Sequence, residues 1–327
     1  MRIGLNIVGQ ARRITLPLAK FRTMTFSLKH WSRLHTVNAV ALHERWLTNP
    51  DAPVSDALLD TTRFNMKTGV WTVENEIELV RLLGALQWHN PGMKLWFRGE
   101  AKYYRKALPK RVRVKSSEAK LTNVGIKWLD SVAHLDRALR DRGALARAAI
   151  LQHYGCPTSL LDVSSSYDVA CAFSFAEGDT GKAHLRVYAL PRHQHAVTVF
   201  GIPDVVLVDL SAELPSYCAR PHVQQAAFIA RREAVYNDIE GKVPVRQAEA
   251  DVDPLCIAHI RLQFKGAARF YKPRKATATL YPKAGLECSR CKTKRPDMNN
   301  DYLLHILDCF QSPQRLPKPA RFPDLHP

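Results

Sequence analysis

An arginine followed by a glycine stands at the end of a short run rich in aromatic residues. Residues 94–99 read Lys-Leu-Trp-Phe-Arg-Gly and are predicted to form a strand. Arg98 at such a strand end could donate two parallel hydrogen bonds to a phosphate or carboxylate, while Gly99 would let a ligand approach the backbone. Glu100 follows directly and belongs to the same candidate ligand-binding segment. A structural bridge between Arg98 and Asp162 is the alternative.

A second group of polar side chains surrounds a Gly-x-Pro turn that follows an expected helix over residues 145–154. His153 can be neutral or charged near pH 7, so it could act as an acid, a base or an oriented donor. His153 and Asp162 are therefore candidate catalytic residues, and Thr158 and Ser159 are candidate ligand-binding hydroxyls. The alternatives are a structural histidine and two hydroxyls that cap the next helix.

A glutamine pair, Gln224 and Gln225, precedes a predicted strand over residues 227–230. The carboxamide of Gln225 could hold a ribose hydroxyl or a substrate amide, which makes it a further candidate catalytic residue. The same side chain could equally tie down a loop.

Three cysteines and a histidine near the C-terminus have nearly the spacing of a single zinc finger. The pattern is Cys-x2-Cys-x13-His-x3-Cys, formed by Cys288, Cys291, His305 and Cys309. A CxxC knuckle brings two thiolates to one side, and residues four apart share one face of a helix. Four protein ligands leave no position open for water, so residues 287–312 are predicted to form a small module with a structural Zn²⁺. An unligated helix with two exposed thiols is the alternative.

The chain is strongly basic. It has 48 Lys and Arg against 30 Asp and Glu, a formal net charge of +18 in 327 residues. This charge favours partners that are polyanions, such as nucleic acid, nucleotides or an anionic membrane surface. Residues 105–115 carry six positive charges and are expected to be solvated or in contact with an anion. Residues 1–43 have no acidic residue, which is typical of a basic arm, a targeting segment or a solvated extension.

The sequence has no run approaching the roughly 18 apolar residues that are needed to span a bilayer. Its seven cysteines are unevenly spread, which argues against a disulfide framework. Both observations predict a soluble, cytoplasmic protein.

Hydrophobic periodicity predicts helices in the first part of the chain and strands later. Residues 1–70 show no sustained period and are expected to be a loosely ordered arm, and residues 313–327 a flexible tail. A helix is expected after Thr72, with the apolar positions Val73, Ile77, Val80, Leu83 and Leu86. Further helices are predicted at 126–139, 145–154 and 169–175, and further strands at 185–190, 205–210, 227–230 and 257–262. This order favours an α+β fold with helices packed on a mixed or antiparallel sheet.

Four segments, in order, resemble the FRG family, which is named for a Phe-Arg-Gly signature. They are Trp96-Phe97-Arg98-Gly99-Glu100, the stretch LQHYGCPTSLLD at residues 151–162, residues 220–228, and Thr279-Leu280-Tyr281-Pro282. The resemblance implies a compact α/β module over residues 71–286.

The chain departs from the family pattern at three positions. Ser159 stands where the family usually has Arg, Val163 where an aromatic residue is usual, and Ala226 where Gly is usual. The loss of a guanidinium at position 159 would remove an anion contact, so the site could be weakened or repurposed.

The order of these elements is also similar to the layout of ADP-ribosyltransferases. Those enzymes place an Arg or His plus a Gly on an early strand, a hydroxyl-bearing turn before a small-residue helix, and a Glu or Gln on a later strand. Arg98-Gly99, Thr158-Ser159 and Gln224-Gln225 fit that scheme. The analogy implies NAD as the ligand and transfer of ADP-ribose through an oxocarbenium-like centre. The carboxylate usual at the last position is missing at Gln225, unless Glu100, Asp162 or Glu233 substitutes.

Two functions therefore remain open. The first is an NAD-binding, ADP-ribosyltransferase-like toxin or phage-defence effector that acts on a macromolecule. The alternative is a non-catalytic nucleic-acid-binding module that uses residues 105–115, the N-terminal arm and the zinc finger.

Overall fold

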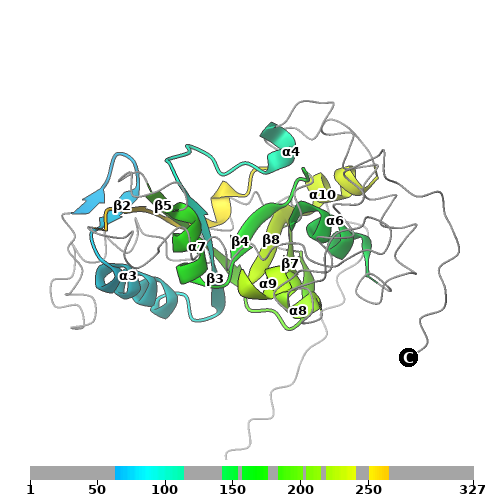
Figure 1. Cartoon of the computed structure of the whole chain (residues 1–327), viewed down its shortest axis with the longest axis horizontal. Helices are drawn as coiled ribbons and strands as arrows, with labels where there is room; N and C mark the ends of the chain where they lie inside the picture. Colours follow the sequence, from blue (N-terminus) through cyan, green and yellow to red (C-terminus); the bar gives the residue numbers. More distant parts are fainter. Residues whose placement is uncertain are drawn as a thin grey trace, which may run out of the picture.

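The computed structural model describes residues 63–113, 142–153, 157–175, 183–201, 204–214, 219–240 and 250–264. Within these residues the chain forms a nine-stranded sheet in the order β1-β2-β9-β5-β3-β4-β8-β7-β6 (Figure 1). The strands are β1 (Phe64–Asn65), β2 (Val70–Val73), β3 (Met93–Glu100), β4 (Leu161–Ser164), β5 (Ala183–Pro191), β6 (Val197–Phe200), β7 (Val205–Asp209), β8 (Ala226–Arg231) and β9 (Cys256–Leu262). All neighbouring strands are antiparallel except β2 and β9, which are parallel.

Helices of different lengths cover the sheet. They are α3 (Glu76–Trp88), α4 (Lys110–Arg113), α6 (Ala144–His153), α7 (Tyr167–Ser174), α8 (Leu210–Glu213), α9 (Ala219–Val223), α10 (Arg232–Ile239) and the 3-10 turn η4 (Asp253–Leu255). No helix of the described part of the chain is long and apolar enough to cross a membrane.

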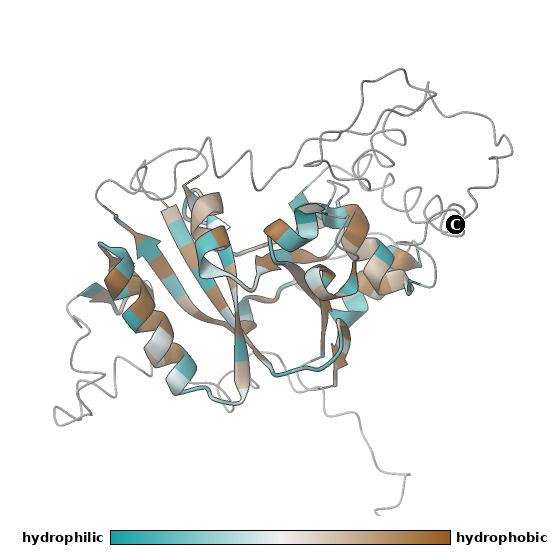
Figure 2. Ribbon diagram, turned by 60° about the horizontal axis from the view of Figure 1, so that its bottom comes forward, coloured by the Kyte–Doolittle hydropathy of each residue, from teal (hydrophilic) through white to brown (hydrophobic). Residues whose placement is uncertain are grey.

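The sheet consists of two halves that meet at a single point. β3 pairs with β5 along its whole length, whereas it pairs with β4 only through Phe97 and Ser164. The first half is therefore β1-β2-β9-β5-β3, and the second is β4-β8-β7-β6. Figures 1 and 2 show α3 and α7 beside the first half, and α6 and α8 beside the second.

The three largest hydrophobic clusters of the described residues follow from the alternation of side chains along the strands. Leu95 and Phe97 of β3 join the first cluster, which packs under α3 and α7. The second lies between β7, β8 and the helices α6 and α10. Trp96 points to the opposite face of β3 and belongs to the third cluster, which spans both halves and includes Leu255 of η4. Each half of the sheet therefore packs against its own helices on one face. On the opposite face, the third cluster joins the two halves.

The helix expected after Thr72 begins later than predicted. Residues 70–73 form β2, and α3 starts at Glu76 with Asn75 as its N-cap. The Asn75 carboxamide oxygen accepts from the Glu78 backbone N–H at 2.9 Å, and the Glu78 carboxylate accepts from the Asn75 side chain at 2.8 Å, a reciprocal cap. The shift changes the buried face: Ile77 and Val80 are exposed, and the core positions are Leu79, Leu82, Leu83, Ala85 and Leu86.

The other well-patterned elements are confirmed, as is the α+β class with a mostly antiparallel sheet. The predictions for β3, β5, β7, β8, β9, α6 and α7 agree with the structure to within a few residues. Four strands were not predicted: β1, β2, β4, whose four residues include Asp162 and Ser164, and the partly exposed β6. β1 lies inside the segment expected to be an arm. The helix predicted at 126–139 and the zinc-finger module at 287–312 fall outside the described residues.

Candidate functional site

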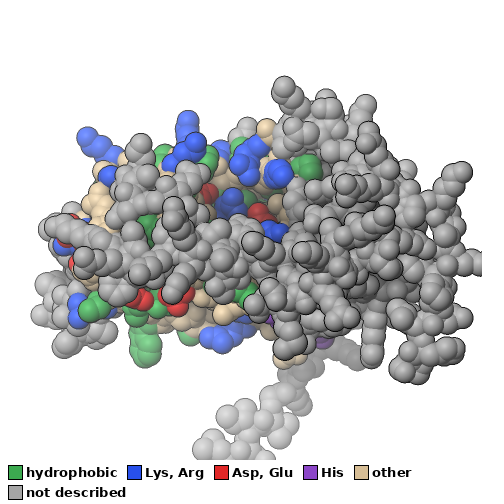
Figure 3. Space-filling view, in the orientation of Figure 1, with side chains coloured by type: hydrophobic (Ala, Val, Ile, Leu, Met, Phe, Trp, Pro, Cys, Tyr) green, Lys and Arg blue, Asp and Glu red, His purple; other side chains and the backbone are tan. Residues whose placement is uncertain are grey.

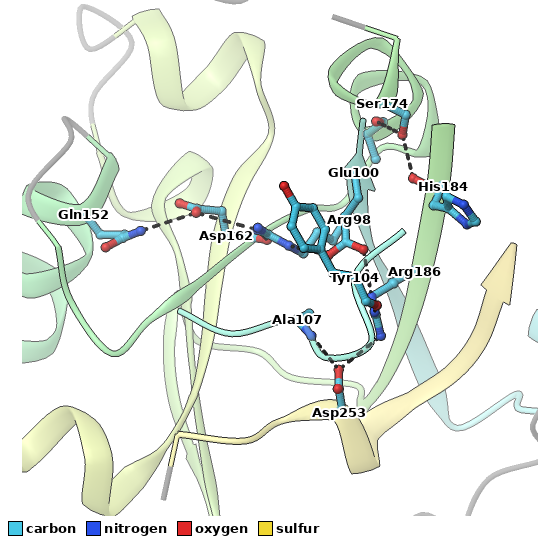
Figure 4. Close-up of polar contacts among 11 residues, drawn as sticks. Arg98, Glu100, Tyr104, Ala107, Gln152, Asp162, Ser174, His184, Arg186 and Asp253 are labelled. Carbon is cyan, nitrogen blue, oxygen red and sulfur yellow. Dashed lines mark hydrogen bonds and ion pairs between the residues drawn. The ribbon is translucent and has the colours of Figure 1, made fainter. Parts of the chain in front are cut away.

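A polar network joins the two halves of the sheet where β3 and β4 meet (Figure 4). Arg98 on β3 stands at its centre. Its Nη1 donates to the backbone carbonyl of Asp162 on β4 at 2.9 Å and lies 3.7 Å from the Asp162 carboxylate. Its Nε donates to Glu100 Oε1 at 3.4 Å. The bridge between Arg98 and Asp162 therefore exists, and it links the halves that share only one backbone pairing.

Glu100 connects this guanidinium to a second one, Arg186 of β5. Arg186 Nε donates to Glu100 Oε2 at 3.0 Å, and Nη1 donates to Asp253 Oδ1 at 3.2 Å. The side chains of Arg186 and Glu100 are only 4% and 2% exposed, so each charge needs its partner. Arg186 Nη2 also donates to the carbonyl of Tyr104, and Asp253 accepts from the Ala107 N–H at 3.2 Å. These bonds hold residues 101–109, which we call the strap, over this face of the sheet.

The other end of the network reaches α6 through Gln152. Its Nε2 donates to Asp162 Oδ2 at 3.3 Å, and its Oε1 accepts from both the backbone N–H and the hydroxyl of Thr158 at 2.9 Å. The Thr158 hydroxyl in turn accepts from the Leu160 N–H at 3.2 Å. Gln152 and Thr158 together fix the loop that leads into β4, and through Asp162 they help to fix Arg98.

Thr158 and Ser159 are both fully buried. The Ser159 N–H donates to the carboxylate of Asp238 on α10, and its hydroxyl has no partner among the described residues. Neither residue caps α7, because Ser166 is the N-cap and accepts from the Val169 N–H at 3.3 Å. The capping interpretation of Thr158 and Ser159 is therefore wrong, and the pair stabilises the turn before β4 instead.

His153 is the last residue of α6 and packs edge-on against Phe228 in the second cluster, with ring centroids 6.0 Å apart. Burial, together with nearby Arg220, holds the pKa of His153 well below its usual value of 6.5. The imidazole is therefore neutral at pH 7.

Gly99 allows a helix, rather than a ligand, to approach the strand. A Cβ built at this position would lie 1.8 Å from the carbonyl oxygen of Ala170 and 2.7 Å from Ser174 Oγ, both on α7. The Ser174 hydroxyl donates to the carbonyls of Ala170 and His184, at 3.0 and 2.8 Å, and so joins α7 to β5. The close contact between β3 and α7 thus depends on the missing side chain at position 99.

Gln225 precedes β8 and is exposed, with a φ of 44°, the left-handed region that favours glycine. Its Oε1 accepts from the Ser165 hydroxyl at 2.9 Å, and its carbonyl accepts from the Ser165 N–H at 3.1 Å. Gln225 therefore ties the β4–α7 turn to β8, which is the loop-fixing alternative. Strained backbone of this kind also clusters at functional sites.

The structure brings Arg98, Glu100 and Asp162 into one network and leaves His153, Ser159 and Gln225 outside it. Sequence reasoning missed Arg186, which holds Glu100 and Asp253 together. A signal was present: His184 and Arg186 alternate within the apolar run Ala183–Pro191, so one face of an otherwise buried strand had to be polar. Among the described residues, no group of three or more His, Cys, Asp or Glu could hold a metal ion. The predicted zinc ligands lie outside those residues.

Arg98, Glu100, Gln152, Asp162 and the loop before β4 fall in one continuous stretch of the chain, whereas Arg186 and Asp253 of the network lie beyond it. Residues 93–183 match the FRG domain. The match runs from the first residue of β3 to the first residue of β5. It includes the first two segments on which the FRG resemblance rests, while residues 220–228 and 279–282 lie beyond it. Comparisons with curated proteins and with solved structures gave no match.

Four histidines in and around the FRG match are expected to make the fold sensitive to acid. The pKa values of four of them are lowered, mainly by burial: His153, His184, His193 and His259. The pKa of His184 falls to about 4 and that of His259 to about 3, with help from Arg261 and Arg186 for the first and from Arg186 and His184 for the second.

Below about pH 6.5 the unfolded chain binds protons at these positions while the folded chain does not, so acid favours unfolding. We expect the free energy of unfolding to fall continuously from about pH 6.5 to about pH 4, above most of the carboxylate titration. Urea titrations at several pH values in this window would measure the slope. His184→Gln should flatten it, and an unchanged slope in that variant would contradict this assignment.

Proposed function

We propose that the FRG domain binds a nucleotide, NAD in particular, beside Arg98 and acts as an ADP-ribosyltransferase-like effector on a macromolecule. The main support for this proposal is that part of the Arg98 guanidinium is free to bind a ligand. Among the described residues its Nη2 has no hydrogen-bond partner, and its side chain is 18% exposed. A guanidinium that is held by two partners and keeps a free edge is prepared to bind a phosphate.

Asp162 is the carboxylate best suited to act in such a site. Its side chain is 53% exposed, although one oxygen accepts from Gln152 and lies near Arg98. Glu100 is buried between two arginines, so we assign it the role of positioning Arg98 rather than contacting substrate. Asp162 could accept a ribose hydroxyl or stabilise the cationic centre that forms when the nicotinamide bond breaks.

The arrangement of elements supports the same proposal. Arg98 on β3 is followed by the hydroxyl-bearing turn at residues 164–166, by the small-residue helix α7, and by Gln225 before β8. Thr158 and Ser159 are buried, so Ser165 and Ser166 of this turn, which are partly exposed, take the place that the sequence analogy gave to them. We infer a cytoplasmic toxin or phage-defence protein from this reaction class and from the composition.

Arg98→Ala is expected to weaken NAD binding by about 10- to 100-fold, the loss of one or two charge-assisted hydrogen bonds. Arg98→Lys keeps the charge but not the fork and should recover only part of the affinity. Calorimetric titration with NAD would measure binding, and release of nicotinamide in the presence of RNA, DNA or cell extract would measure turnover.

Arg232→Ala is a matched control, because Arg232 pairs with Asp204 at 2.7 Å on the surface and takes no part in the network. NAD binding that is equal in wild type, Arg98→Ala and Arg232→Ala would refute the proposal. Thermal unfolding of each variant separates a lost ligand contact from a lost fold.

A non-catalytic nucleic-acid-binding module remains the second candidate, favoured by the net charge of +18. The short helix α4 (Lys110–Arg113) belongs to the basic segment 105–115. Residues 1–62 of the N-terminal arm and the proposed Zn²⁺ module lie outside the described residues, so binding experiments must test their contribution. Steep salt dependence of nucleic-acid binding, unaffected by Arg98→Ala, would favour this function over the transferase.

A further inference from the structure

Tyr103, at the start of the strap, lies over two imidazoles on the neighbouring strands. Its ring stacks on His259 of β9, with centroids 5.0 Å apart and planes at 6°, and meets the edge of His184 of β5 at 5.5 Å. One face of Tyr103 is thus occupied, yet the residue is 50% exposed. A flat aromatic surface therefore remains open, on a support that fixes its orientation.

The two imidazoles beneath Tyr103 have polar atoms that the described part of the chain leaves unsatisfied. His184 Nδ1 and His259 Nε2 are buried without a hydrogen-bond partner in that part, and His184 is only 6% exposed. Both nitrogens are buried, so the imidazoles support the Tyr103 ring and are not part of its open face. Burial lowers the pKa of His184 to about 4 and that of His259 to about 3, so both rings are neutral at pH 7 and place no positive charge beneath Tyr103.

Exposed cations surround this aromatic surface. Lys102 and Arg105 flank Tyr103 and Tyr104 in the strap, and neither makes an ion pair within the described residues. The Lys102 ammonium lies 5.5 Å from the centre of the exposed Tyr104 ring. Arg261 of β9 is also exposed and lies near enough to His184 to lower its pKa. Figure 3 shows Lys and Arg side chains gathered along the upper part of the described surface in that view.

The nearby carboxylates are already engaged, so they do not neutralise this surface. Asp251 pairs with Lys106 at 2.6 Å, while Glu100 and Asp253 pair with Arg186. The strap therefore presents aromatic rings and unpaired positive charge to solvent, and its negative partners lie beneath it.

We propose that Tyr103 and Tyr104, with Lys102, Arg105 and Arg261, form a surface that binds single-stranded nucleic acid, and that His184 and His259 support the Tyr103 ring from beneath. One unpaired base stacks on the open face of Tyr103, whose other face rests on His259. The cations contact the neighbouring phosphates. Two successive exposed rings with cations distributed along the strap and β9 suit a strand better than a free mononucleotide, which carries one base and one phosphate cluster. The inference does not depend on Arg98 or on NAD chemistry.

The test is fluorescence anisotropy with labelled oligo-uridine and oligo-thymidine strands of about 12 nucleotides. Tyr103→Ala is expected to weaken binding by about 5- to 100-fold, the usual contribution of one stacked base. Tyr103→Phe keeps the ring and should bind within about twofold of wild type. Tyr236→Ala is a matched control, since Tyr236 is also an exposed tyrosine but belongs to α10 and not to the strap. Lys102→Gln and Arg105→Gln should each reduce the slope of log affinity against log salt concentration by about one, the effect of one lost phosphate contact.

Three results would overturn the proposal. The first is a Tyr103→Ala variant that is folded, as judged by circular dichroism, and binds both strands as tightly as wild type. The second is equal competition by a duplex, whose bases are not free to stack on a side chain. The third is competition by adenosine monophosphate at the same concentration as the strand, which would identify a mononucleotide site. NAD binding in the same variants separates this site from the proposed function.

Discussion

Replacing Arg186 by methionine is expected to lower the free energy of unfolding by about 3–5 kcal/mol, because it leaves buried carboxylates without a counter-charge. Glu100 would keep only the longer contact to Arg98 at 3.4 Å, and Asp253 would lose its guanidinium partner altogether. The strap would also lose the bond between Arg186 and the Tyr104 carbonyl. Urea unfolding followed by circular dichroism measures the loss.

A double-mutant cycle tests whether the cost comes from the uncompensated charge. Glu100→Gln removes one of the charges that Arg186 balances, so Arg186→Met combined with Glu100→Gln should be destabilised by less than the sum of the single changes. Lys106→Met is a matched control, because Lys106 also pairs with an aspartate but is 44% exposed and should cost at most about 1 kcal/mol. If Arg186→Met cost no more than Lys106→Met, the buried network would not be the main link between the strap and the sheet.

The same network explains how a residue on β5 can influence a site on β3. Arg98 is held on one side by Glu100, and Glu100 is held by Arg186. Arg186 does not reach the exposed edge of Arg98, so its effect on ligand binding would be one of positioning. A change at Arg186 should therefore alter the proposed binding of NAD only to the extent that Arg98 moves.

Much of the fold could be predicted because local pattern and tertiary environment agree. The buried helices α6 and α7 and the apolar strands β5, β7, β8 and β9 each have a clear hydrophobic period, and each lies near its predicted position. The start of α3 was misplaced because Val73 continues the apolar spacing of the helix while pairing with Leu262 of β9. A parallel partner nearly two hundred positions away leaves no local signal.

The candidate site was predictable in its residue types but not in its connections. The ion pair between Arg98 and Asp162 could be predicted because the FRG-like segments contain few other charged residues. The role of Glu100 could not be predicted, because it depends on the β3–β5 register that sets Glu100 opposite His184 and Arg98 opposite Arg186. Burial likewise separates Thr158 from a ligand, although its sequence context resembles a binding turn.

Gly99→Ala is expected to destabilise the protein by about 3 kcal/mol or more, at the upper end of the cost of overpacking. The added Cβ would meet the Ala170 carbonyl, which is helix backbone and cannot rotate away as a side chain would. Either α7 must move from β3, which opens the first hydrophobic cluster, or β3 must shift and carry Arg98 with it. The variant should therefore unfold at a lower urea concentration, and it should also weaken the proposed binding of a nucleotide beside Arg98.

Gly84→Ala provides the matched comparison. Gly84 lies on the exposed side of α3, where a Cβ would meet nothing within 4 Å. Since glycine is a poor residue inside a helix, alanine there should stabilise the protein by about 0.5–1 kcal/mol. The same chemical change would thus have opposite signs at the two positions. If Gly99→Ala were as stable as wild type, the glycine of the FRG signature would not serve helix packing, and close approach of a ligand to the β3 backbone would become the better explanation.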